Sequence, residues 1–157
     1  MTPVPPPADG VHRFAGSCSW TGSTVGEYSR THSASAGDVE LTLSAAPAFA
    51  GDPEHLDPEQ LVVLAAASCQ LLSFLAVAAR ARLDVRGYRD DATAAMPTEP
   101  TPMRLAEIVL RPRITLVGGP SEARVRHLVE VAHRECFIAN SLATPVTVSP
   151  VIEFVPS

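Results

Sequence analysis

Clustered basic side chains are missing from this sequence of 157 residues. The net charge is −5, and the Arg residues form no block. Nucleic acids and anionic membrane surfaces attract proteins through basic patches, so neither is an expected partner. Charged residues make up 18% of the chain and apolar residues 46%, which is typical of a globular protein rather than a disordered one.

A secretory signal is also missing. The first ten residues carry four prolines and no basic residue, whereas a signal needs a positive start followed by about 7–15 apolar residues. We therefore expect residues 1–10 to be a mobile Pro-rich N-terminus, residues 11–157 to form one domain, and the protein to be cytoplasmic. Its three cysteines should then be thiols at rest rather than a disulfide framework.

Common signatures of catalysis and metal binding are missing as well. The sequence contains no HExxH, P-loop or GxSxG motif and no internal repeat. His133 and Cys136 are spaced so that they could share a zinc ion, but no second pair completes a set of four ligands. We therefore expect no bound metal, and we expect the scattered histidines to be surface or hydrogen-bonded residues.

The hydrophobic pattern predicts strands, a long helix, more strands, a second helix and a closing strand. The strands are expected over residues 11–21, 38–44, 85–94, 106–117 and 146–155, with a loop over residues 46–56. Pro112 removes a hydrogen-bond donor from the fourth strand, which indicates a sheet edge or a bulge there. Pro150 interrupts the last strand. This order is typical of an α+β fold rather than of alternating βαβ units.

The long helix has a recognisable start and an uncharged middle. Asp57 is a candidate cap, Pro58 fits the first turn and Gln60 completes a capping box. Residues 61–79 carry no charge, and the helix should end near residues 82–83. A run of this length could span a membrane, but polar residues cluster at its middle and no second such segment exists. We therefore predict a central helix that is buried on all sides.

Two cysteines are candidates for chemistry. Cys69 lies in the middle of the long helix, and Cys136 follows a second helix expected over residues 122–134, with Ser121 as its cap. Either thiol could simply be a small apolar core residue. A reactive Cys69 needs a cation from elsewhere in the protein, because the middle of a helix provides no positive end. Cys18 is expected to be structural.

Several segments of the sequence resemble the OsmC/Ohr family. DPEQL and AASC resemble the family's N-P-E-[EQ]-L…[SA]-C segment, and AHREC with NS resembles its second-cysteine segment, A-H-x-x-C…[SA]-N. SRTH and AAPAFAGD look like the early segments of an OsmC-like branch. In chain order these six segments are residues 29–32, 45–52, 57–61, 66–69, 132–136 and 140–141. The similarity extends over nearly the whole chain after residue 10.

The resemblance implies a thiol-dependent peroxidase for organic hydroperoxides. The implied fold is an OsmC-like α+β fold, with antiparallel sheets around a long buried helix and a second helix, in an intertwined homodimer. By the match, Cys69 is the peroxidatic thiol, Cys136 the resolving thiol and Glu59 the activating carboxylate. Arg30 is the candidate activating arginine, with Arg13 as the alternative. The resemblance implies no bound cofactor and an external dithiol reductant, dihydrolipoyl or lipoylated in type.

The helix geometry adds one hypothesis to this resemblance. Glu59 and Cys69 lie about 15 Å apart along a continuous helix, so they cannot meet within one chain. We expect the Glu59 and Arg30 that serve a given Cys69 to come from the partner chain. The apolar residues around Cys69 favour a bulky organic or lipid-type hydroperoxide.

Two positions differ from the family pattern. Asp57 replaces the usual Asn, and both residues cap helices equally well. Gln70 follows the first cysteine, where the peroxidase branches often have Phe or another apolar residue, and this changes the pocket. Two alternatives to an enzyme therefore stay open. One is a redox-sensing or small-molecule-binding protein without efficient turnover, and the other is a structural dimer with inert thiols.

Overall fold

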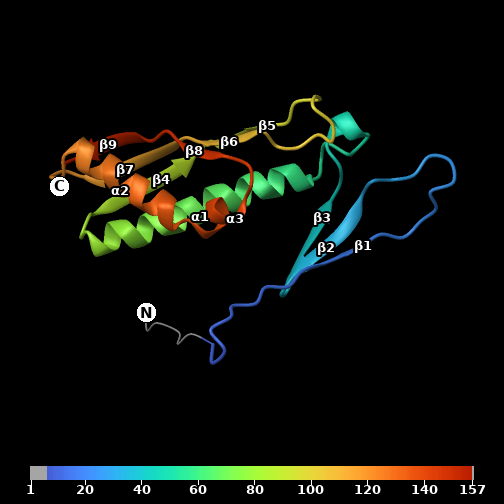
Figure 1. The fold of residues 1–157 in the computed structure, drawn as a ribbon, viewed down its shortest axis with the longest axis horizontal. Helices are drawn as coiled ribbons and strands as arrows, with labels where there is room; N and C mark the ends of the chain where they lie inside the picture. Colours follow the sequence, from blue (N-terminus) through green and yellow to red (C-terminus); the bar gives the residue numbers. More distant parts are fainter. Residues whose placement is uncertain (1–6, 157) are drawn as a thin grey trace. The chain divides into compact units, whose positions relative to one another are not determined.

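The computed structural model describes residues 7–156, and the chain falls into two units, Met1–Pro58 and Glu59–Ser157 (Figure 1). The predicted Pro-rich N-terminus covers residues 1–10, of which residues 1–6 lie outside the described part.

The first unit contains one antiparallel sheet of three strands. Its strands are β1 (Ser17–Ser19), β2 (His32–Ala36) and β3 (Val39–Leu43), in that order across the sheet, and a 3-10 helix, η1 (Pro47–Phe49), follows. The alternation of Val39, Leu41 and Leu43 correctly predicted β3. The strand expected over residues 11–21 is reduced to β1. The sequence analysis missed β2, whose HSASA sequence contains neither β-branched nor aromatic residues.

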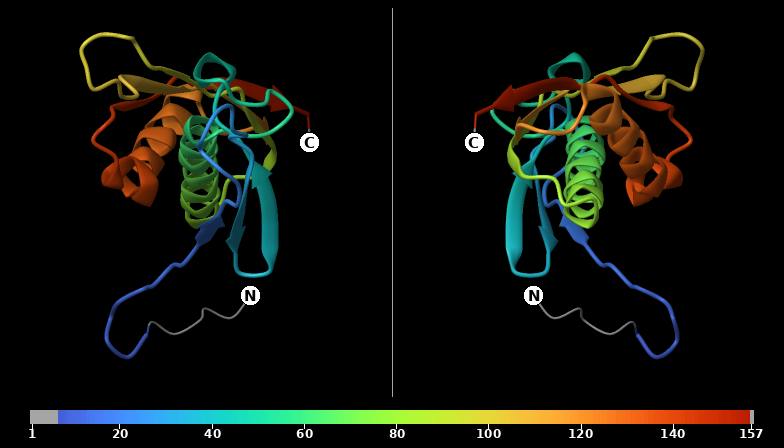
Figure 2. Two further views of the ribbon diagram at one scale, coloured as in Figure 1. Left: turned by 90° about the vertical axis from the view of Figure 1, so that its right-hand side faces the viewer. Right: turned by 90° about the vertical axis from the view of Figure 1, so that its left-hand side faces the viewer.

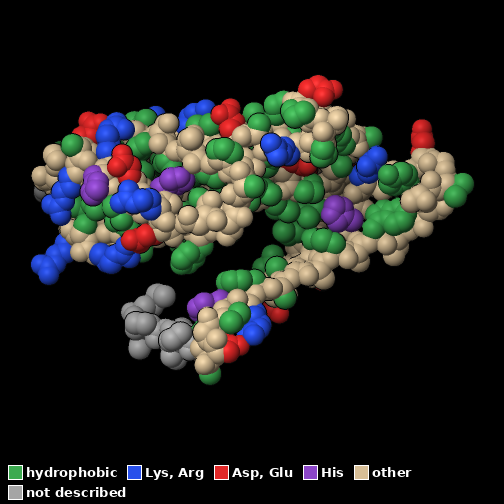
Figure 3. All heavy atoms as spheres, in the orientation of Figure 1, with side chains coloured by type: hydrophobic (Ala, Val, Ile, Leu, Met, Phe, Trp, Pro, Cys, Tyr) green, Lys and Arg blue, Asp and Glu red, His purple; other side chains and the backbone are tan. Residues whose placement is uncertain are grey.

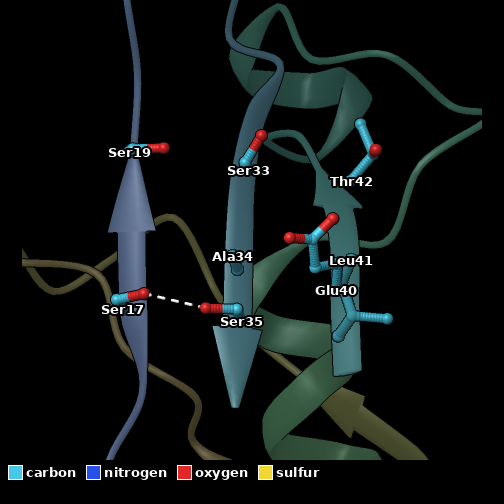
Figure 4. Close-up of a pocket in the computed structure, with 8 residues that line it drawn as sticks. All are labelled: Ser17, Ser19, Ser33, Ala34, Ser35, Glu40, Leu41 and Thr42. Atoms are coloured by element: carbon cyan, nitrogen blue, oxygen red, sulfur yellow. Dashed lines mark hydrogen bonds between the residues drawn. The ribbon is translucent and has the colours of Figure 1, made fainter. Parts of the chain in front are cut away.

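This sheet has a face of hydroxyl groups and an apolar face. Ser17 and Ser35 form a hydrogen bond of 2.8 Å between their Oγ atoms, and Ser19, Ser33 and Thr42 lie near them (Figure 4). Cys18, Ala34 and Leu41 are aligned across the three strands at the alternate positions. Among the described residues of this unit, none covers the apolar face, on which Val39 is 60% exposed and Leu41 41% exposed.

The second unit is built around α1 (Pro58–Arg80), which confirms the predicted long helix to within a few residues at each end. Its C-terminus is a Schellman motif. Arg82 adopts a left-handed conformation (φ 57°), its N–H donates to the carbonyl of Ala79 (3.0 Å), and Leu83 N–H donates to the carbonyl of Ala78 (3.0 Å).

The second predicted helix is also confirmed, as α2 (Glu122–Glu135). The Ser121 hydroxyl accepts a hydrogen bond from Arg124 N–H (3.3 Å), which is the predicted cap. A one-turn helix, α3 (Phe137–Ser141), follows directly and was not predicted. Cys136 is the single residue between α2 and α3.

Each of the three strands predicted in this unit is divided, and its two halves enter different sheets. One sheet has the order β4-β7-β9 and the other β5-β6-β8. The β4–β7 and β5–β6 pairs are antiparallel, but β7–β9 and β6–β8 are parallel, so both sheets are mixed rather than antiparallel as expected. The strands are β4 (Val85–Asp90), β5 (Thr93–Ala95), β6 (Glu107–Leu110), β7 (Pro112–Val117), β8 (Val146–Val148) and β9 (Val151–Val155).

Pro112 was predicted to mark a sheet edge or a bulge, but it lies at neither: the register shift of the β4–β7 pair falls between Val85 and Gly87. Pro112 is the first residue of β7, which lies between β4 and β9 as the middle strand of its sheet. The first position of a strand tolerates proline, because a missing N–H does not interrupt the ladder there. The chain passes from one sheet to the other at Arg111, whose N–H donates to Asp90 Oδ1 (2.7 Å).

Helices α1 and α2 lie side by side against the same side of these strands (Figures 1 and 2). Two apolar clusters join them to the sheets. The larger cluster is built from α1, α2 and β7, and its buried members are Phe74, Val77, Ala78, Ile114, Leu116, Val125, Val129 and Ala132. The smaller one joins the first half of α1 to β6 through Ala66, Ile108 and Leu110, with Ile138 of α3 packed against it.

Only one face of α1 is buried in the single chain, which corrects the prediction of a helix buried on all sides. The buried residues follow a helical period: Ala66, Gln70, Phe74, Val77 and Ala78. Elsewhere on the helix, Leu64 is 52% exposed and Leu72 64% exposed. The physical reason is that two helices and one layer of strands leave one side of α1 uncovered.

By length and composition alone, α1 is long and apolar enough to cross a membrane. The core helix of a globular protein meets the same criterion, and the residues of α1 in both apolar clusters favour that interpretation.

On the face drawn in Figure 3, acidic and basic side chains lie interspersed. Ion pairs such as Arg126–Glu122 (2.7 Å) and Arg80–Glu135 (2.6 Å) join acidic and basic side chains of the second unit.

Candidate functional site

The fold brings two cysteines from distant parts of the sequence into contact. Cys69 lies in the middle of α1, and Cys136 lies at the junction of α2 and α3. The Cys136 and Cys69 side chains lie close enough to interact, and the N–H of Ile138, two residues after Cys136, donates to Cys69 Sγ (3.4 Å). All three cysteines of the chain are free thiols. The structure therefore contains a reduced dithiol pair.

The two thiols differ in their exposure. Cys69 is half-buried, whereas Cys136 is only 1% exposed. Burial raises the pKa of the Cys136 thiol, the backbone N–H of Ala139 lowers it, and the interaction with Cys69 raises it further. Cys136 is accordingly a neutral thiol at neutral pH and keeps an S–H group. Of the pair, Cys69 is the more accessible to a reactant from solvent.

A break in the helix positions Cys136. Its backbone is extended (φ −72°, ψ 110°), and its N–H donates to the carbonyl of His133 (3.2 Å) at the end of α2. The Asn140 side-chain amide donates to the carbonyls of Arg134 (2.9 Å) and Cys136 (3.0 Å). Asn140 thus gives the carbonyl of Arg134, in the last turn of α2, a hydrogen-bond partner from outside the helix. The position of Cys136 is fixed by its backbone.

Gln70, the residue after Cys69, makes a second connection between α1 and α2. It is fully buried, and its Nε2 donates to the carbonyl of Val129 (3.4 Å). Its Oε1 lies 3.3 Å from Nδ1 of His133. The sequence analysis identified Gln70 as a departure that changes the pocket. The structure shows that its amide group is directed toward α2.

Two buried polar groups on β4, one of them near Cys136, were not predicted from the sequence. Among the described residues, neither the Tyr88 hydroxyl nor Asp90 Oδ2 has a hydrogen-bond partner. Burial raises the pKa of Tyr88, with smaller contributions from Asp90 and Cys136, and burial also raises the pKa of Asp90. Their spacing on β4 places them on one face of the strand, which is the signal that could have found them.

The other predicted site residues are Glu59, Arg30 and Arg13, and none of their described contacts is with Cys69. Glu59 lies in the first turn of α1, and Cys69 follows on the same continuous helix about 15 Å further on. In the first unit, the exposed Arg30 guanidinium lies 4.9 Å above the centre of the Tyr28 ring, a cation–π contact. Arg13, the alternative arginine, forms an exposed ion pair with Asp9 (2.6 Å).

His133 and Cys136 are the two possible zinc ligands that the sequence suggested, and among the described residues they have no third ligand beside them. Within residues 7–156, no three His, Cys, Asp or Glu side chains lie close enough together to hold a metal ion. His133 Nδ1 faces Gln70, and the Cys136 thiol interacts with the Cys69 thiol, so the described contacts of both side chains are with other side chains.

Comparisons with solved structures find the same fold in bacterial proteins. An OsmC-like protein of unknown function from Vibrio cholerae O1 biovar eltor is 27% identical, with a TM-score of 0.82 over 90% of this chain and 100% of that one. An OsmC-like protein from Mycoplasma pneumoniae is 17% identical, with a TM-score of 0.75 over 90% and 98%. An organic hydroperoxide resistance protein OsmC from Legionella pneumophila is 18% identical, with a TM-score of 0.70 over 91% and 98%.

The sequence comparisons cover less of the chain than the structural ones do. No curated protein matches this chain. The family model described as OsmC-like protein matches residues 51–150, which include α1 with Cys69, both mixed sheets apart from β9, and the junction that holds Cys136. Fold, dithiol pair and family match agree, and the chain belongs to the OsmC-like protein family.

Proposed function

We propose that this protein is a thiol-dependent peroxidase that reduces organic hydroperoxides through Cys69 and Cys136. The observation that carries the proposal is the proximity of the two thiols, with Cys69 Sγ also accepting a hydrogen bond from the N–H of Ile138 just beyond Cys136 (3.4 Å). A peroxidatic thiol has to be reachable by its substrate, and a resolving thiol has to lie close enough to condense with it. Half-buried Cys69 and buried Cys136 fit these two roles. Similar folds include proteins named for organic hydroperoxide resistance.

The chemistry proceeds in three steps. The Cys69 thiolate attacks an oxygen of the hydroperoxide, the O–O bond breaks, the alcohol leaves with a proton, and Cys69 becomes a sulfenic acid. Cys136 then condenses with this sulfenic acid to form a disulfide and water. An external dithiol of the dihydrolipoyl class reduces the disulfide by two thiol exchanges and is itself oxidised. The raised pKa of Cys136 keeps its proton in place during the first step.

Arg30 and Glu59 of a partner chain complete the proposed site. An arginine stays charged and stabilises both a thiolate and the departing oxygen, and a carboxylate orients the guanidinium through paired hydrogen bonds. Glu59 and Cys69 are separated along one rigid helix. This separation supports a contribution of Glu59 from a second copy of the chain.

Two uncovered apolar surfaces support a homodimer. One is the face of α1 with Leu64, Leu72 and Leu75, which are 52%, 64% and 40% exposed. The other is the apolar face of the β1–β2–β3 sheet, where Leu41 is 41% exposed. A sheet of three strands needs packing on an apolar face to be stable. Burial of both surfaces in a dimer would supply that packing.

The apolar surroundings of Cys69 favour a bulky organic hydroperoxide. Its neighbours include Ile138 of α3 and the exposed Leu72 one turn further along α1. Apolar walls with few polar groups bind the apolar body of such a substrate better than they bind hydrogen peroxide. A cytoplasmic location is part of the same proposal, because a reducing compartment keeps the three free cysteines as thiols.

Single-turnover oxidation by cumene hydroperoxide tests this function. We expect the wild type to lose two thiols rapidly, Cys69→Ser to lose neither of them, and Cys136→Ser to accumulate a sulfenic acid that a dimedone probe captures. Cys18→Ser is the control and should react as the wild type does, because Cys18 is not one of the two thiols to which the proposal assigns a role. Unchanged thiols in every variant would mean that the family fold is present without the chemistry. Thiols that react only slowly with every hydroperoxide tried would favour a redox sensor.

A further inference from the structure

The buried amide of Gln70 has a single orientation that is consistent with its neighbours. A backbone carbonyl only accepts hydrogen bonds, so the amide NH₂ group has to face the carbonyl of Val129 (3.4 Å). The amide oxygen therefore faces His133 (3.3 Å). An amide that is fully buried loses both hydration sites, and these two contacts replace them.

This orientation fixes the tautomer of His133. The Gln70 oxygen is an acceptor, so Nδ1 of the ring has to carry a hydrogen and donate it. In the neutral ring, Nε2 is then the nitrogen without a hydrogen. The half-buried ring also lines a hollow of about 530 Å³ between α2 and β8, together with Arg126, Glu130 and Arg134. Substitutions at His133 therefore have room to be accommodated.

The contact between Gln70 and His133 joins the same two segments as the contact between the two thiols. Cys69 and Gln70 are consecutive on α1, and His133 and Cys136 lie within the last turn of α2 and its cap. The same two short segments are thus joined twice, by the thiol pair and by the amide–imidazole pair. A disulfide bond of about 2 Å is shorter than any hydrogen bond between thiols. The end of α2 therefore has to approach α1 for the disulfide to form.

We propose that Gln70 and His133 form a positioning bridge that holds the end of α2 against α1 and sets the rate at which Cys69 and Cys136 join. The role in a peroxide cycle rests on the proposed function, but the positioning itself does not. A displacement of about 1 Å between reacting groups can reduce a rate 100-fold. Neither residue exchanges atoms with the sulfurs, so both are positioning residues.

The first test is the tautomer of His133 in the reduced wild type. Nitrogen-15 NMR at a pH above about 8, where imidazoles are neutral, should show the hydrogen on Nδ1 and the unprotonated nitrogen at Nε2. Gln70→Met fills a similar volume without an acceptor and should shift His133 to the Nε2–H form. A wild-type ring in the Nε2–H form would overturn the bridge without the need for any variant.

The second test is the rate of disulfide formation with diamide, an azo compound that takes up two electrons and two protons as two thiols become a disulfide. Phe at position 133 keeps a ring but removes the donor, so we expect His133→Phe to slow the formation of the Cys69–Cys136 disulfide roughly tenfold, the factor that one net hydrogen bond gives. His133→Asn places an amide N–H near the position of Nδ1–H and should retain the wild-type rate within about twofold. His127→Phe, on the exposed side of α2, is the matched control and should have no effect.

A wild-type rate in His133→Phe would overturn the proposal. So would an Asn variant as slow as the Phe variant, because it would show that the imidazole itself moves a proton. Diamide oxidises thiols without peroxide chemistry. A failure of the peroxidase function would therefore leave this measurement intact, and the two proposals fail separately.

Discussion

The hydroxyl group of Tyr88 makes a direct test of the packing near Cys136 possible. It is buried and, among the described residues, has no hydrogen-bond partner, and an unsatisfied buried donor costs about 1–3 kcal/mol. Phe at this position keeps the packing against Phe74, whose ring centre lies 5.9 Å away. We expect Tyr88→Phe to raise the free energy of unfolding by about 1 kcal/mol, measured by urea denaturation.

The control for this prediction is Tyr28→Phe, because the Tyr28 side chain is 44% exposed and its hydroxyl can reach water. That change should leave the free energy of unfolding within about 0.5 kcal/mol. A loss of stability in Tyr88→Phe would mean that an ordered water or another group satisfies the hydroxyl and that the buried site is polar.

At the same scale, the sequence identified the chemical groups of the site but not their contacts. Cys69, Cys136 and Gln70 were all singled out from the sequence, and the structure brings the two thiols close enough to interact. Their catalytic roles stay predictions. No pattern in the chain could show that the Gln70 amide faces His133, because that contact depends on how α1 and α2 pack. Tyr88 was missed because the partner of a hydroxyl is a property of the tertiary structure.

At the scale of the helices, one residue at the C-terminus of α1 has an unfavourable backbone conformation. Arg82 adopts a left-handed conformation (φ 57°), which is unfavourable for a residue with a Cβ atom and natural for glycine. We expect Arg82→Gly to raise the free energy of unfolding by about 0.5–1 kcal/mol. Ala79→Gly, three residues earlier inside the helix, should lower it by about 1 kcal/mol.

Thermal denaturation of these two variants beside the wild type measures both effects. Both variants introduce glycine, which increases the backbone entropy of the unfolded chain at either position. The opposite signs come from the two backbone conformations, left-handed at position 82 and helical at position 79. Destabilisation by both glycines would show that the Schellman motif does not hold in solution.

The helices were predicted better than the strands, for a physical reason. Local signals mark helix ends, as the Ser121 cap and the start of α1 at Pro58 show. The passage of a strand into another sheet is set by distant partners. Pro150 was recognised as an interruption, but its consequence is that β8 joins β6 while β9 joins β7. The parallel pairing of these strands with segments more than thirty residues earlier has no local sequence signal.

For the whole molecule, the uncovered face of α1 leads to a prediction about assembly. Leu72 is 64% exposed in the single chain, and the proposed homodimer buries it. A carboxylate at that position would be an unpaired buried charge, which costs several kcal/mol. We expect sedimentation velocity to show a dimer for the wild type and a shift toward monomer for Leu72→Glu.

Ala123→Glu, on the exposed side of α2, is the matched control for the added charge and should remain a dimer. A wild type that sediments as a monomer at all concentrations would contradict the homodimer and, with it, the contribution of Arg30 and Glu59 from a partner chain.

The α+β class and the family were predicted from the sequence, and both are confirmed. A single domain over residues 11–157 stays a prediction. The family signal was readable because two short cysteine segments keep their order and spacing. The mixed pairing of the two sheets could not be predicted, because the hydrophobic pattern of a buried strand is similar in parallel and antiparallel pairing.

The distance in sequence between Cys69 and Cys136 has a consequence for the lifetime of the protein. In the proposed cycle, their disulfide closes a loop of roughly 70 residues, and the chain-entropy model assigns such a loop about 4 kcal/mol of added stability. The reduced protein would therefore open more often than the oxidised one, and proteases act on opened molecules. A cell short of reductant would accumulate the form that is degraded most slowly, so abundance would follow redox supply without any change in synthesis.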